Sequence, residues 1–410
     1  MHFYMAWRNV WRNPKRTGII LTAIIIGAWS MLAFCALSRG VMDSALESAL
    51  NTLTGHIQIQ HPLFREDPAV ENRIKAPDAV ATLLNKNLPP GAAWAFRIQA
   101  PGVASNARES QGITIVGIDP QKEPALSFYG HNTAQGRLLT PGDDRGIVVG
   151  QALLDTFETK IGHKLVLMTQ DANLDTASQA FKIRGSFRAD MEATEKQYVF
   201  ITLNAAQKLL GIGNDVSLAC IRLPGKTTLD PVELDRTVAA LNKGMPRDLT
   251  ILTWMELLPL LQGYLSMFDR FMLLWYLVIF IAMAFGLVNT MLMAVLERTR
   301  EFGLLKALGL KPVRIAGNVL LESLILLVTG LVAGNLLGMV TIQCLSGGID
   351  MSFMAQGSEF FGMGRLVVPF VTPMDFCLVN AVIAGLGIFV CLYPAAKAAG
   401  ITPVDAMTYV

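Results

Sequence analysis

Charged residues are scarce in this sequence. Only 16% of its 410 residues are Asp, Glu, Lys or Arg, against roughly 25% in ordinary soluble proteins. The 34 basic and 32 acidic residues leave a net charge of +2, which excludes the strongly basic surface of a typical nucleic-acid-binding protein. With 52% hydrophobic residues and a mean hydropathy of +0.43, the composition indicates a membrane protein.

Cysteine is also rare. Four of the five cysteines (Cys35, Cys344, Cys377 and Cys391) lie in or beside long apolar segments, and Cys220 stands alone in the polar stretch between them. A single cysteine excludes a disulfide within that stretch. At about 230 residues it is long enough to fold around a hydrophobic core of its own.

Motifs for catalysis or metal binding are missing as well. Gly225-Lys226-Thr227 is similar to the end of a phosphate-binding loop, but Cys220 stands where that motif needs its first glycine. His56 and His61 are five residues apart, so on a strand they fall on opposite faces. We therefore expect a chain that is not an enzyme and that binds no metal or cofactor.

Long apolar runs, in contrast, are present. A membrane-spanning helix needs about 20 apolar residues, and lipid forces such a segment to satisfy its own backbone as a helix. A cleaved signal peptide is the alternative for the first run, but its length and the three runs that follow favour an uncleaved anchor. The four predicted spans are Gly18–Leu37, Phe271–Leu296, Val319–Leu345 and Phe376–Tyr393.

The basic residues predict the orientation, because Lys and Arg collect on the cytoplasmic side. They are dense before the first span and between the second and third, whereas few flank the other ends. Both termini are therefore expected in the cytoplasm of a bacterial inner membrane, with Arg39–Arg270 outside. The cytoplasmic set is Arg8, Arg12, Lys15, Arg16, Arg298, Arg300, Lys306, Lys311 and Arg314, and the opposite set is Arg39, Arg270 and Arg365.

The outer stretch is predicted to be an α+β domain. Gly55–Gln60 alternates in polarity like a half-buried strand. Met42–Leu53 and Trp254–Arg270 are expected to be helices continuous with the first and second spans. Further strands are predicted at Gly112–Ile118, Gly146–Val149, Lys164–Met168, Phe181–Phe187, Gln197–Ile201, Val216–Leu223 and Leu249–Leu252, and helices at Pro77–Leu88, Gln151–Glu158, Asn204–Leu210 and Pro231–Asn242.

Three glycines, Gly330, Gly334 and Gly338, recur every four residues in the third span. This spacing places them on one helix face, where small residues allow another helix to approach closely. Glycine is also simply common in membrane helices, but three in register favour packing. The partner helix can belong to this chain or to a second one.

The loop between the second and third spans is the most informative segment. Its charged start, Glu297, Arg298, Arg300 and Glu301, is followed by Gly303 and by an apolar stripe of Leu304, Leu305 and Leu308 at helical spacing. Such a short amphipathic helix rests on lipid or docks into a partner's groove. Glu322, near the cytoplasmic end of the third span, is either functional or in contact with interfacial water.

Several segments resemble one known family. Glu297–Gly309 is similar to the ERTREIGxLKALG signature of FtsX-like permeases, the membrane subunits of MacB-type (type VII) ABC transporters. Tyr393–Ala399 with Pro403–Ala406 resembles the PAxxAAxxxPxxAL ending of that family, and Ala6–Asn13 its amphipathic entry helix. Gly55–Ile59 and Val116–Pro120 are similar to motifs of the lipoprotein-releasing LolC/LolE branch.

The resemblance implies a four-helix membrane protein with a MacB-like outer domain, a Porter fold carrying a Sabre insertion at Pro120–Ala180. A separate cytoplasmic ATPase would bind ATP and dock on Glu297–Leu308. Expected partners are a second permease subunit, identical or related, and membrane lipid, but no nucleic acid. Lipoprotein release is the leading function. The alternatives are MacB-like efflux, an FtsX-like mechanotransmitter, and an anchored enzyme or receptor without an ATPase.

In the lipoprotein-releasing branch a hairpin of one subunit hooks a periplasmic carrier. The equivalent stretch, Met168–Ala180, contains Asp171 and Asp175 but no proline and no basic residue. These two aspartates are the candidate carrier-binding residues. The expected division of the chain is 1–38 (entry helix and first span), 39–270 (outer domain), 271–296, 297–316 (coupling loop), 317–345, 346–375 (outer loop), 376–394 and 395–410 (tail).

Overall fold

The computed structural model describes residues 7–8, 10–75, 77–130, 133–189, 191–224, 231–350 and 366–402. Two compact units divide the chain: a membrane unit of Met1–Met42, Leu265–Ile349 and Leu366–Val410, and an outer unit formed mainly by Asp43–Tyr264. The glycine-lysine-threonine stretch at Gly225 and the tail motif from Pro403 lie outside the described residues, as do Arg365 and the entry-helix residues Ala6 and Asn9.

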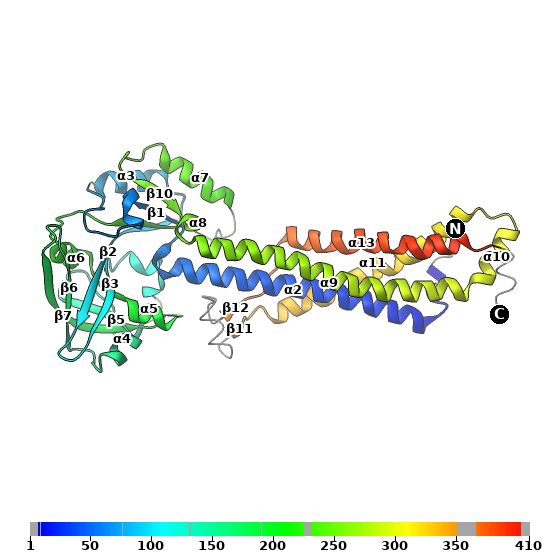
Figure 1. Ribbon diagram of the computed structural model, residues 1–410, viewed down its shortest axis with the longest axis horizontal. Helices are drawn as coiled ribbons and strands as arrows, with labels where there is room; N and C mark the ends of the chain where they lie inside the picture. The colour runs from blue at the N-terminus through cyan, green and yellow to red at the C-terminus, as the bar shows by residue number, and fades with distance from the viewer. Residues whose placement is uncertain are drawn as a thin grey trace. The chain divides into compact units, whose positions relative to one another are not determined.

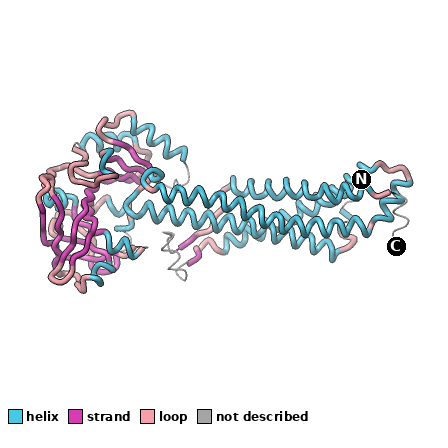
Figure 2. The backbone as a smooth tube through the Cα atoms, in the orientation of Figure 1, coloured by secondary structure: helices cyan, strands magenta, loops and turns pink. Residues whose placement is uncertain are grey.

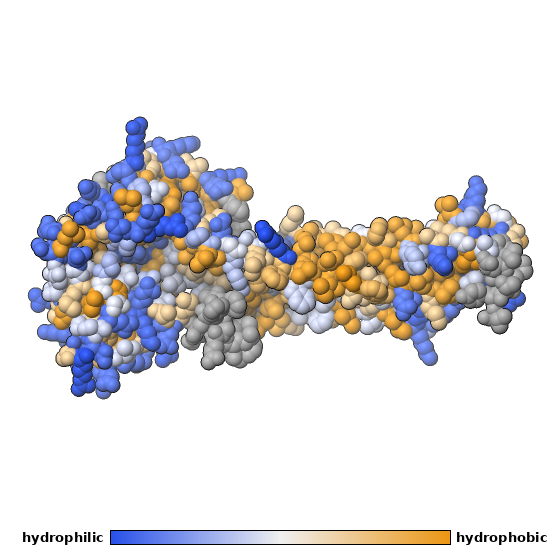
Figure 3. Space-filling view, in the orientation of Figure 1, coloured by the Kyte–Doolittle hydropathy of each residue, from blue (hydrophilic) through white to orange (hydrophobic). Residues whose placement is uncertain are grey.

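Four long helices form the membrane unit (Figure 1). Each of them is long and apolar enough to cross a bilayer, and each contains one of the spans predicted from the sequence, except that α11 ends at Cys344, one residue before the expected end of the third span. Their apolar side chains form a hydrophobic outer surface in the space-filling view (Figure 3). The helices are α2 (Pro14–Ala49), α9 (Pro259–Glu297), α11 (Pro312–Cys344) and α13 (Pro373–Gly400).

Proline and threonine set the starts of these helices. Pro312 and Pro373 occupy the first helical position of α11 and α13, where a missing N–H costs nothing. The Thr372 hydroxyl caps α13 by accepting a hydrogen bond from the Asp375 amide at 3.1 Å. Between α9 and α11 the chain forms a short helix, α10 (Thr299–Ala307), as the amphipathic pattern predicts.

The outer unit is a mixed sheet with helices packed against it (Figure 2, strands in magenta). Its strand order is β10-β1-β9-β2-β3-β8-β5-β7-β4, and β6 pairs with both β2 and β7. The strands are β1 (Ile57–Gln60), β2 (Ala93–Ser105), β3 (Ser110–Ile118), β4 (Thr133–Gly136), β5 (Gly146–Gly150), β6 (Lys164–Gln170), β7 (Thr176–Phe187), β8 (Tyr198–Thr202), β9 (Leu218–Arg222) and β10 (Thr250–Thr253).

Strand β2 joins the two halves of this sheet. Ala93–Arg97 pair with β9, whereas Val103–Ser105 pair with β6 along the same side of the strand, and β3 pairs along the other. Strand β2 was not predicted, because Pro101-Gly102 in its middle is a turn signal. The helices are α3 (Pro77–Asn87), α4 (Gln151–Thr156), α5 (Glu192–Gln197), α6 (Leu203–Leu210), α7 (Pro231–Asn242) and α8 (Trp254–Leu257).

Three expectations are wrong in detail. Strand β1 is not half-buried: it lies between β9 and β10, and its polar residues Gln58 and Gln60 are buried as well as its isoleucines, as is the preceding His56. The helix expected at Trp254–Arg270 is interrupted at Leu258, because the next residue, Pro259, has no N–H to continue the α8 ladder. Strand β7 begins at Thr176, five residues before the start expected at Phe181.

The core of the outer unit is aromatic. Phe128, Phe187 and Phe200 pack on one another with ring centroids 5.2 to 5.9 Å apart, and the Tyr129 ring lies 4.9 Å from that of Phe200. Such tilted and edge-to-face pairs add to the stabilisation from burial. A cysteine-poor domain is thereby stabilised by packing, since Cys220 is buried and carries a free thiol.

Candidate functional site

The outward face of α10 presents the predicted leucine stripe. Leu304, Leu305 and Leu308 are 64, 39 and 77% exposed, and Arg300 is exposed beside them. Apolar side chains grouped on a short helix and left uncovered mark an interaction surface. We call these three leucines the docking face.

The inward face of α10 seats the helix on the membrane unit. Phe302 is buried in a cluster contributed by the adjoining ends of the long helices: Val295, Ile315, Val319, Ala395 and Ala398. Gly303 is buried too, so it offers no surface to a partner. Sequence reasoning missed Phe302, although an aromatic residue on the face opposite an apolar stripe was the available signal.

Charged contacts hold α10 at its start. The Arg12 guanidinium donates to Glu301 at 2.7 Å, and Arg16 donates to Glu297 at 3.1 Å. Burial raises the pKa of Glu301, but the hydrogen bonds from Arg12 and Arg298 outweigh it and hold the pKa below its usual range. Basic residues that the sequence assigned only to orientation therefore also bind α10, through Arg12, and the end of α9, through Arg16.

Two further contacts tie α10 to the third and fourth spans. Arg298, at the N-cap position of α10, donates to both carboxylate oxygens of Glu322 at 2.9 and 3.0 Å. Lys306 donates to the carbonyl oxygens of Ala399 and Ile401, at 2.5 and 2.6 Å, and so caps the end of α13. Glu322 is buried and bonded to arginine, rather than reaching interfacial water.

The glycine face of α11 packs against the first span of the same chain. A Cβ at Gly330 would lie 2.5 Å from a side-chain atom of Ile24, and one at Gly338 would lie 2.7 Å from Leu32. At Gly334 it would meet the Ala28 Cβ at 2.7 Å and the Ile25 carbonyl oxygen at 2.9 Å. The glycines of α11 therefore pack against α2 of the same chain.

In the outer unit, Asp171 and Asp175 form the turn between β6 and β7. The Asp171 carboxylate accepts hydrogen bonds from the amides of Asn173 and Asp175 at 2.8 and 3.0 Å. Its charge therefore stabilises the turn, in which Leu174 has a φ of 66°. Asp175 is exposed at the end of this turn.

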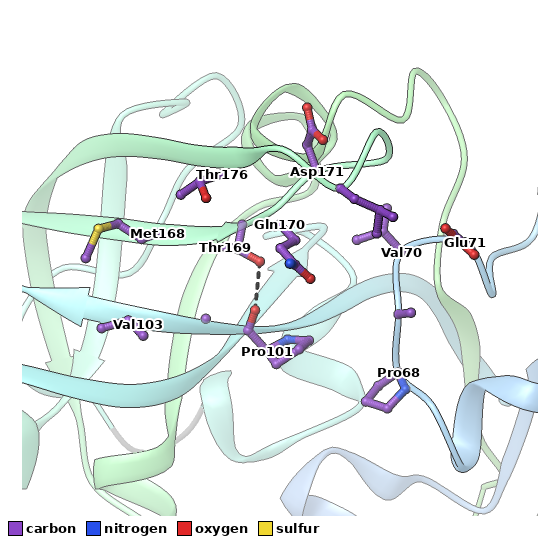
Figure 4. Close-up of a pocket in the computed structure, with 13 residues that line it drawn as sticks. Pro68, Val70, Glu71, Pro101, Val103, Met168, Thr169, Gln170, Asp171 and Thr176 are labelled. Carbon is purple, nitrogen blue, oxygen red and sulfur yellow. Dashed lines mark hydrogen bonds between the residues drawn. The ribbon is translucent and has the colours of Figure 1, made fainter.

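A pocket of about 420 Å³ lies beside this hairpin (Figure 4). It sits where β2 changes neighbours, and the Thr169 hydroxyl donates to the Pro101 carbonyl at 2.7 Å on its wall. Most of its lining is apolar, with Pro68, Val70, Val103, Met168 and Leu174 among the residues. The carboxylates of Glu71 and Asp171 also line it, and its apolar part has room for a small apolar group.

A buried ion pair holds the end of α2 within the outer unit. After Ala49 the helix widens into a π-helical turn, η1 (Leu50–Thr54), in which Leu53 has a φ of 66°. Arg97 donates to the Leu53 carbonyl at 2.5 Å and to Glu123 at 2.7 and 3.1 Å, and both side chains of this pair are fully buried. Nothing in the sequence pattern pointed to this contact, because Arg97 and Glu123 are far apart in the chain.

The two histidines considered as metal ligands accept hydrogen bonds from backbone amides. His56 Nδ1 accepts from the Leu223 amide at 3.2 Å, and His61 Nδ1 accepts from Leu63 at 3.3 Å. Burial, helped by the nearby Arg222 guanidinium, lowers the pKa of His56 to about 4. Among the described residues no group of three or more His, Cys, Asp or Glu is placed to hold a metal ion.

The fold and the position of α10 define a class: a polytopic membrane protein with a separate α+β domain and a short, leucine-faced helix packed on the ends of its long helices. Comparison with known families agrees. Residues 17–235 match the MacB-like periplasmic core domain, and residues 273–403 match the FtsX-like permease C-terminal domain. The chain belongs to the FtsX-like, MacB-type family of ABC transporter permeases.

Individual relatives are distant. The lipoprotein-releasing system transmembrane protein LolC of Neisseria meningitidis is 22% identical over 74% of this chain and 75% of that protein. The macrolide export ATP-binding/permease protein MacB of Agrobacterium fabrum is 24% identical over 98% of this chain, which spans 60% of that relative's length. The crystal structure of the periplasmic region of MacB from Actinobacillus actinomycetemcomitans superposes with a TM-score of 0.35 at 13% identity, over 52% of this chain and 91% of that one.

Proposed function

We propose that this chain is the permease subunit of an inner-membrane ABC transporter whose ATP is hydrolysed by a separate cytoplasmic ATPase docked on α10. Two permease subunits, identical or related, would form the membrane part, with both termini in the cytoplasm. The ATPase would bind the nucleotide, and this chain would convert the resulting movement into a change of its outer unit.

The docking face carries this proposal. Leu304 and Leu308 are exposed on a helix that already packs on the membrane unit through Phe302, so most of their apolar surface is left uncovered within this chain. A groove on a partner protein that buries them would gain about 1.5–3 kcal/mol for each. The exposed Arg300 beside them favours a protein surface with acidic groups over the hydrocarbon of the bilayer.

The end of α2 supports a lever-like role for the outer unit. Helix α2 extends from Pro14 to Ala49, and the turn that follows it, η1, is bonded through Leu53 to the buried Arg97–Glu123 pair. A helix fixed to a domain core by a desolvated guanidinium resists local rearrangement there. Displacement of the helix would therefore move the outer sheet with it.

Lipoprotein extraction from the inner membrane is the substrate assignment we favour. The match to LolC spans about three quarters of both chains. In this case the hairpin turn at Asp171 and Asp175, with its adjacent apolar pocket, is the candidate contact for a periplasmic carrier. Efflux of another substrate is the second candidate, because the MacB match covers 98% of this chain.

Replacing Leu304 and Leu305 together with serine tests the docking assignment. Loss of two buried leucines should remove roughly 3–6 kcal/mol of contact energy, a hundredfold or more in affinity. The measurement is the amount of ATPase that co-purifies with the variant in mild detergent. Leu174→Ser, which removes an exposed leucine from the outer unit, is the matched control and should recruit the ATPase normally.

Undiminished recruitment by a folded double variant would show that the leucines rest on lipid. Recruitment of no ATPase by the unaltered chain would refute the permease assignment itself. If the unaltered chain does recruit an ATPase, the proteins that co-purify with it from the outer side distinguish carrier-dependent lipoprotein release from efflux of another substrate.

A further inference from the structure

We propose that Arg298 and Glu322 form a positioning pair that transmits movement of the docking helix into the third span. The proposal rests on the proposed function, because it assumes that an ATPase moves α10. It assigns different tasks to two parts of the coupling site: the leucines bind the partner, and this ion pair passes the movement on.

The pair joins two elements at a single point. Arg298 immediately precedes α10, and Glu322 lies three turns into α11. One guanidinium nitrogen, Nη1, lies 2.9 and 3.0 Å from the two carboxylate oxygens. The contact is shielded from solvent, since 14% of the Arg298 side chain and 10% of the Glu322 side chain are exposed.

The Arg298 guanidinium also belongs to a longer series of charged contacts. Arg298 Nε donates to Glu301 at 3.0 Å, and Glu301 in turn accepts from Arg12 at 2.7 Å. A series of four alternating charges thus runs from the N-terminal segment through α10 into α11. The Arg12 end of this series is solvated, with 61% of the Arg12 side chain exposed. Solvent screening weakens the contact at that end, so the shielded Arg298–Glu322 pair is the strongest contact of the series.

Geometry makes this pair suited to transmission. The apolar contacts of Phe302 keep α10 in place, but they are non-directional and tolerate sliding or rotation. A guanidinium is planar and presents its donors in a fixed fork, and here the fork is filled by Glu301 on one side and Glu322 on the other. Rotation of α10 therefore displaces the carboxylate, and with it α11.

The third span is well placed to distribute the movement. Its glycine face is in close contact with α2 at Gly330, Gly334 and Gly338, and α2 continues beyond the membrane segment to Ala49. A shift of α11 at Glu322 cannot be absorbed by side chains along that face, because backbone and Cβ atoms already meet there. The movement passes to α2.

Glu322→Gln is the discriminating variant. Glutamine has the same shape and keeps one acceptor oxygen for Arg298, so the fold loses the charge attraction without gaining an unpaired buried carboxylate. The complex of permease and ATPase is reconstituted in lipid nanodiscs, and two quantities are measured. They are the affinity for the ATPase and the change in hydrogen exchange of outer-unit residues 50–60 on addition of ATP with vanadate.

We expect ATPase affinity within about threefold of the unaltered complex, together with loss of the ATP-dependent exchange difference in the outer unit. The charge-swapped pair, Arg298→Glu with Glu322→Arg, should restore part of that difference, and Arg298→Glu alone should not. Glu158→Gln, which removes a carboxylate from the exposed Arg108–Glu158 pair, is the control and should behave as the unaltered chain.

Each other outcome counts against the proposal. A normal exchange difference in Glu322→Gln overturns it, and so does loss of ATPase binding in a folded Glu322→Gln protein, which would make Glu322 part of the docking contact. If Glu322→Gln does not fold, the exchange difference of the charge-swapped pair is the test instead. If neither variant folds, the ion pair is needed for the stability of the fold and the proposal is rejected. An unaltered chain that binds no ATPase refutes the proposed function instead.

Discussion

Polar residues are buried in the outer unit where the end of α2 meets the sheet. The Arg97 guanidinium is withdrawn from water and compensated by Glu123 and by the Leu53 carbonyl. Gln58 donates to the carbonyls of Leu53 and Thr54 at 3.3 and 2.7 Å, so a strand expected to be half exposed is held inside by hydrogen bonds. Buried polar groups with satisfied partners specify one arrangement and resist alternatives.

His56 makes this region sensitive to acid. Burial and Arg222 lower its pKa from 6.5 to about 4, so the unfolded chain binds a proton that the folded chain excludes. The resulting stabilisation is complete above about pH 6.5 and is lost as the pH falls toward 4, by roughly 3 kcal/mol in total. The melting temperature of the protein in detergent should therefore drop between pH 7 and pH 4.5.

His56→Asn keeps an acceptor for the Leu223 amide but does not titrate, and it should flatten the pH dependence over this range. The control is His163→Asn, because His163 is exposed and its replacement should leave the profile unchanged. A His56→Asn profile as steep as that of the unaltered chain would assign the acid sensitivity to other groups.

At the scale of elements, α11 and α2 pack closely because the glycines of α11 have no side chains. The three glycines of α11 accept Ile24, Ala28 and Leu32, which recur every four residues along α2. Without a hydrophobic driving force between helices in lipid, this close approach supplies the dispersion contacts that hold the pair together. The four-residue repeat therefore serves the fold of one chain.

Gly334→Ala tests this packing. The new Cβ would lie 2.7 Å from the Ala28 Cβ and 2.9 Å from the Ile25 carbonyl oxygen, and such overpacking costs about 1–3 kcal/mol. A lower melting temperature in detergent is the expected result, with the subunit stoichiometry unchanged. Gly385→Ala, where nothing lies within 4 Å of the new atom, is the matched control and should be neutral or stabilising.

If Gly334→Ala is as stable as Gly385→Ala, the close approach of α11 and α2 is not what the glycines provide. Dissociation of an oligomer with an unchanged melting temperature would assign the glycine face to subunit contact instead.

At the scale of the whole molecule, orientation would decide which surfaces a cytoplasmic ATPase can reach. The basic residues predict that α10 and the docking face lie in the cytoplasm and the β6–β7 hairpin outside. The ion pairs of Arg12 and Arg16 with Glu301 and Glu297 give part of the same basic cluster a structural role at that end of the membrane unit. One set of residues would therefore direct insertion and hold the coupling helix.

Labelling in intact cells tests the orientation. In a chain whose five cysteines are replaced, a cysteine at the exposed Asn173 should react with a membrane-impermeant thiol reagent admitted to the outer side of the inner membrane. A cysteine at the exposed Lys311 should react only after the membrane is permeabilised. The reverse pattern would invert the topology and place the docking face away from any cytoplasmic ATPase.

The sequence by itself determined the membrane architecture and most of the outer strands. Span length, hydropathy and glycine spacing are local properties, and lipid leaves a long apolar segment only one backbone solution. The leucine stripe of α10 is equally local, because a helix converts spacing along the chain into a face. These features needed no knowledge of distant residues.

Only the tertiary structure decided which faces are covered. It placed Phe302 inside and Leu304 outside, paired Arg298 with Glu322, and brought Arg97 to Leu53 across 44 residues of sequence. It also placed β1 between β9 and β10 and buried its polar side, where Gln58 bonds the carbonyls of Leu53 and Thr54. Burial and charge pairing depend on what the rest of the chain brings to a residue, and no local pattern encodes that.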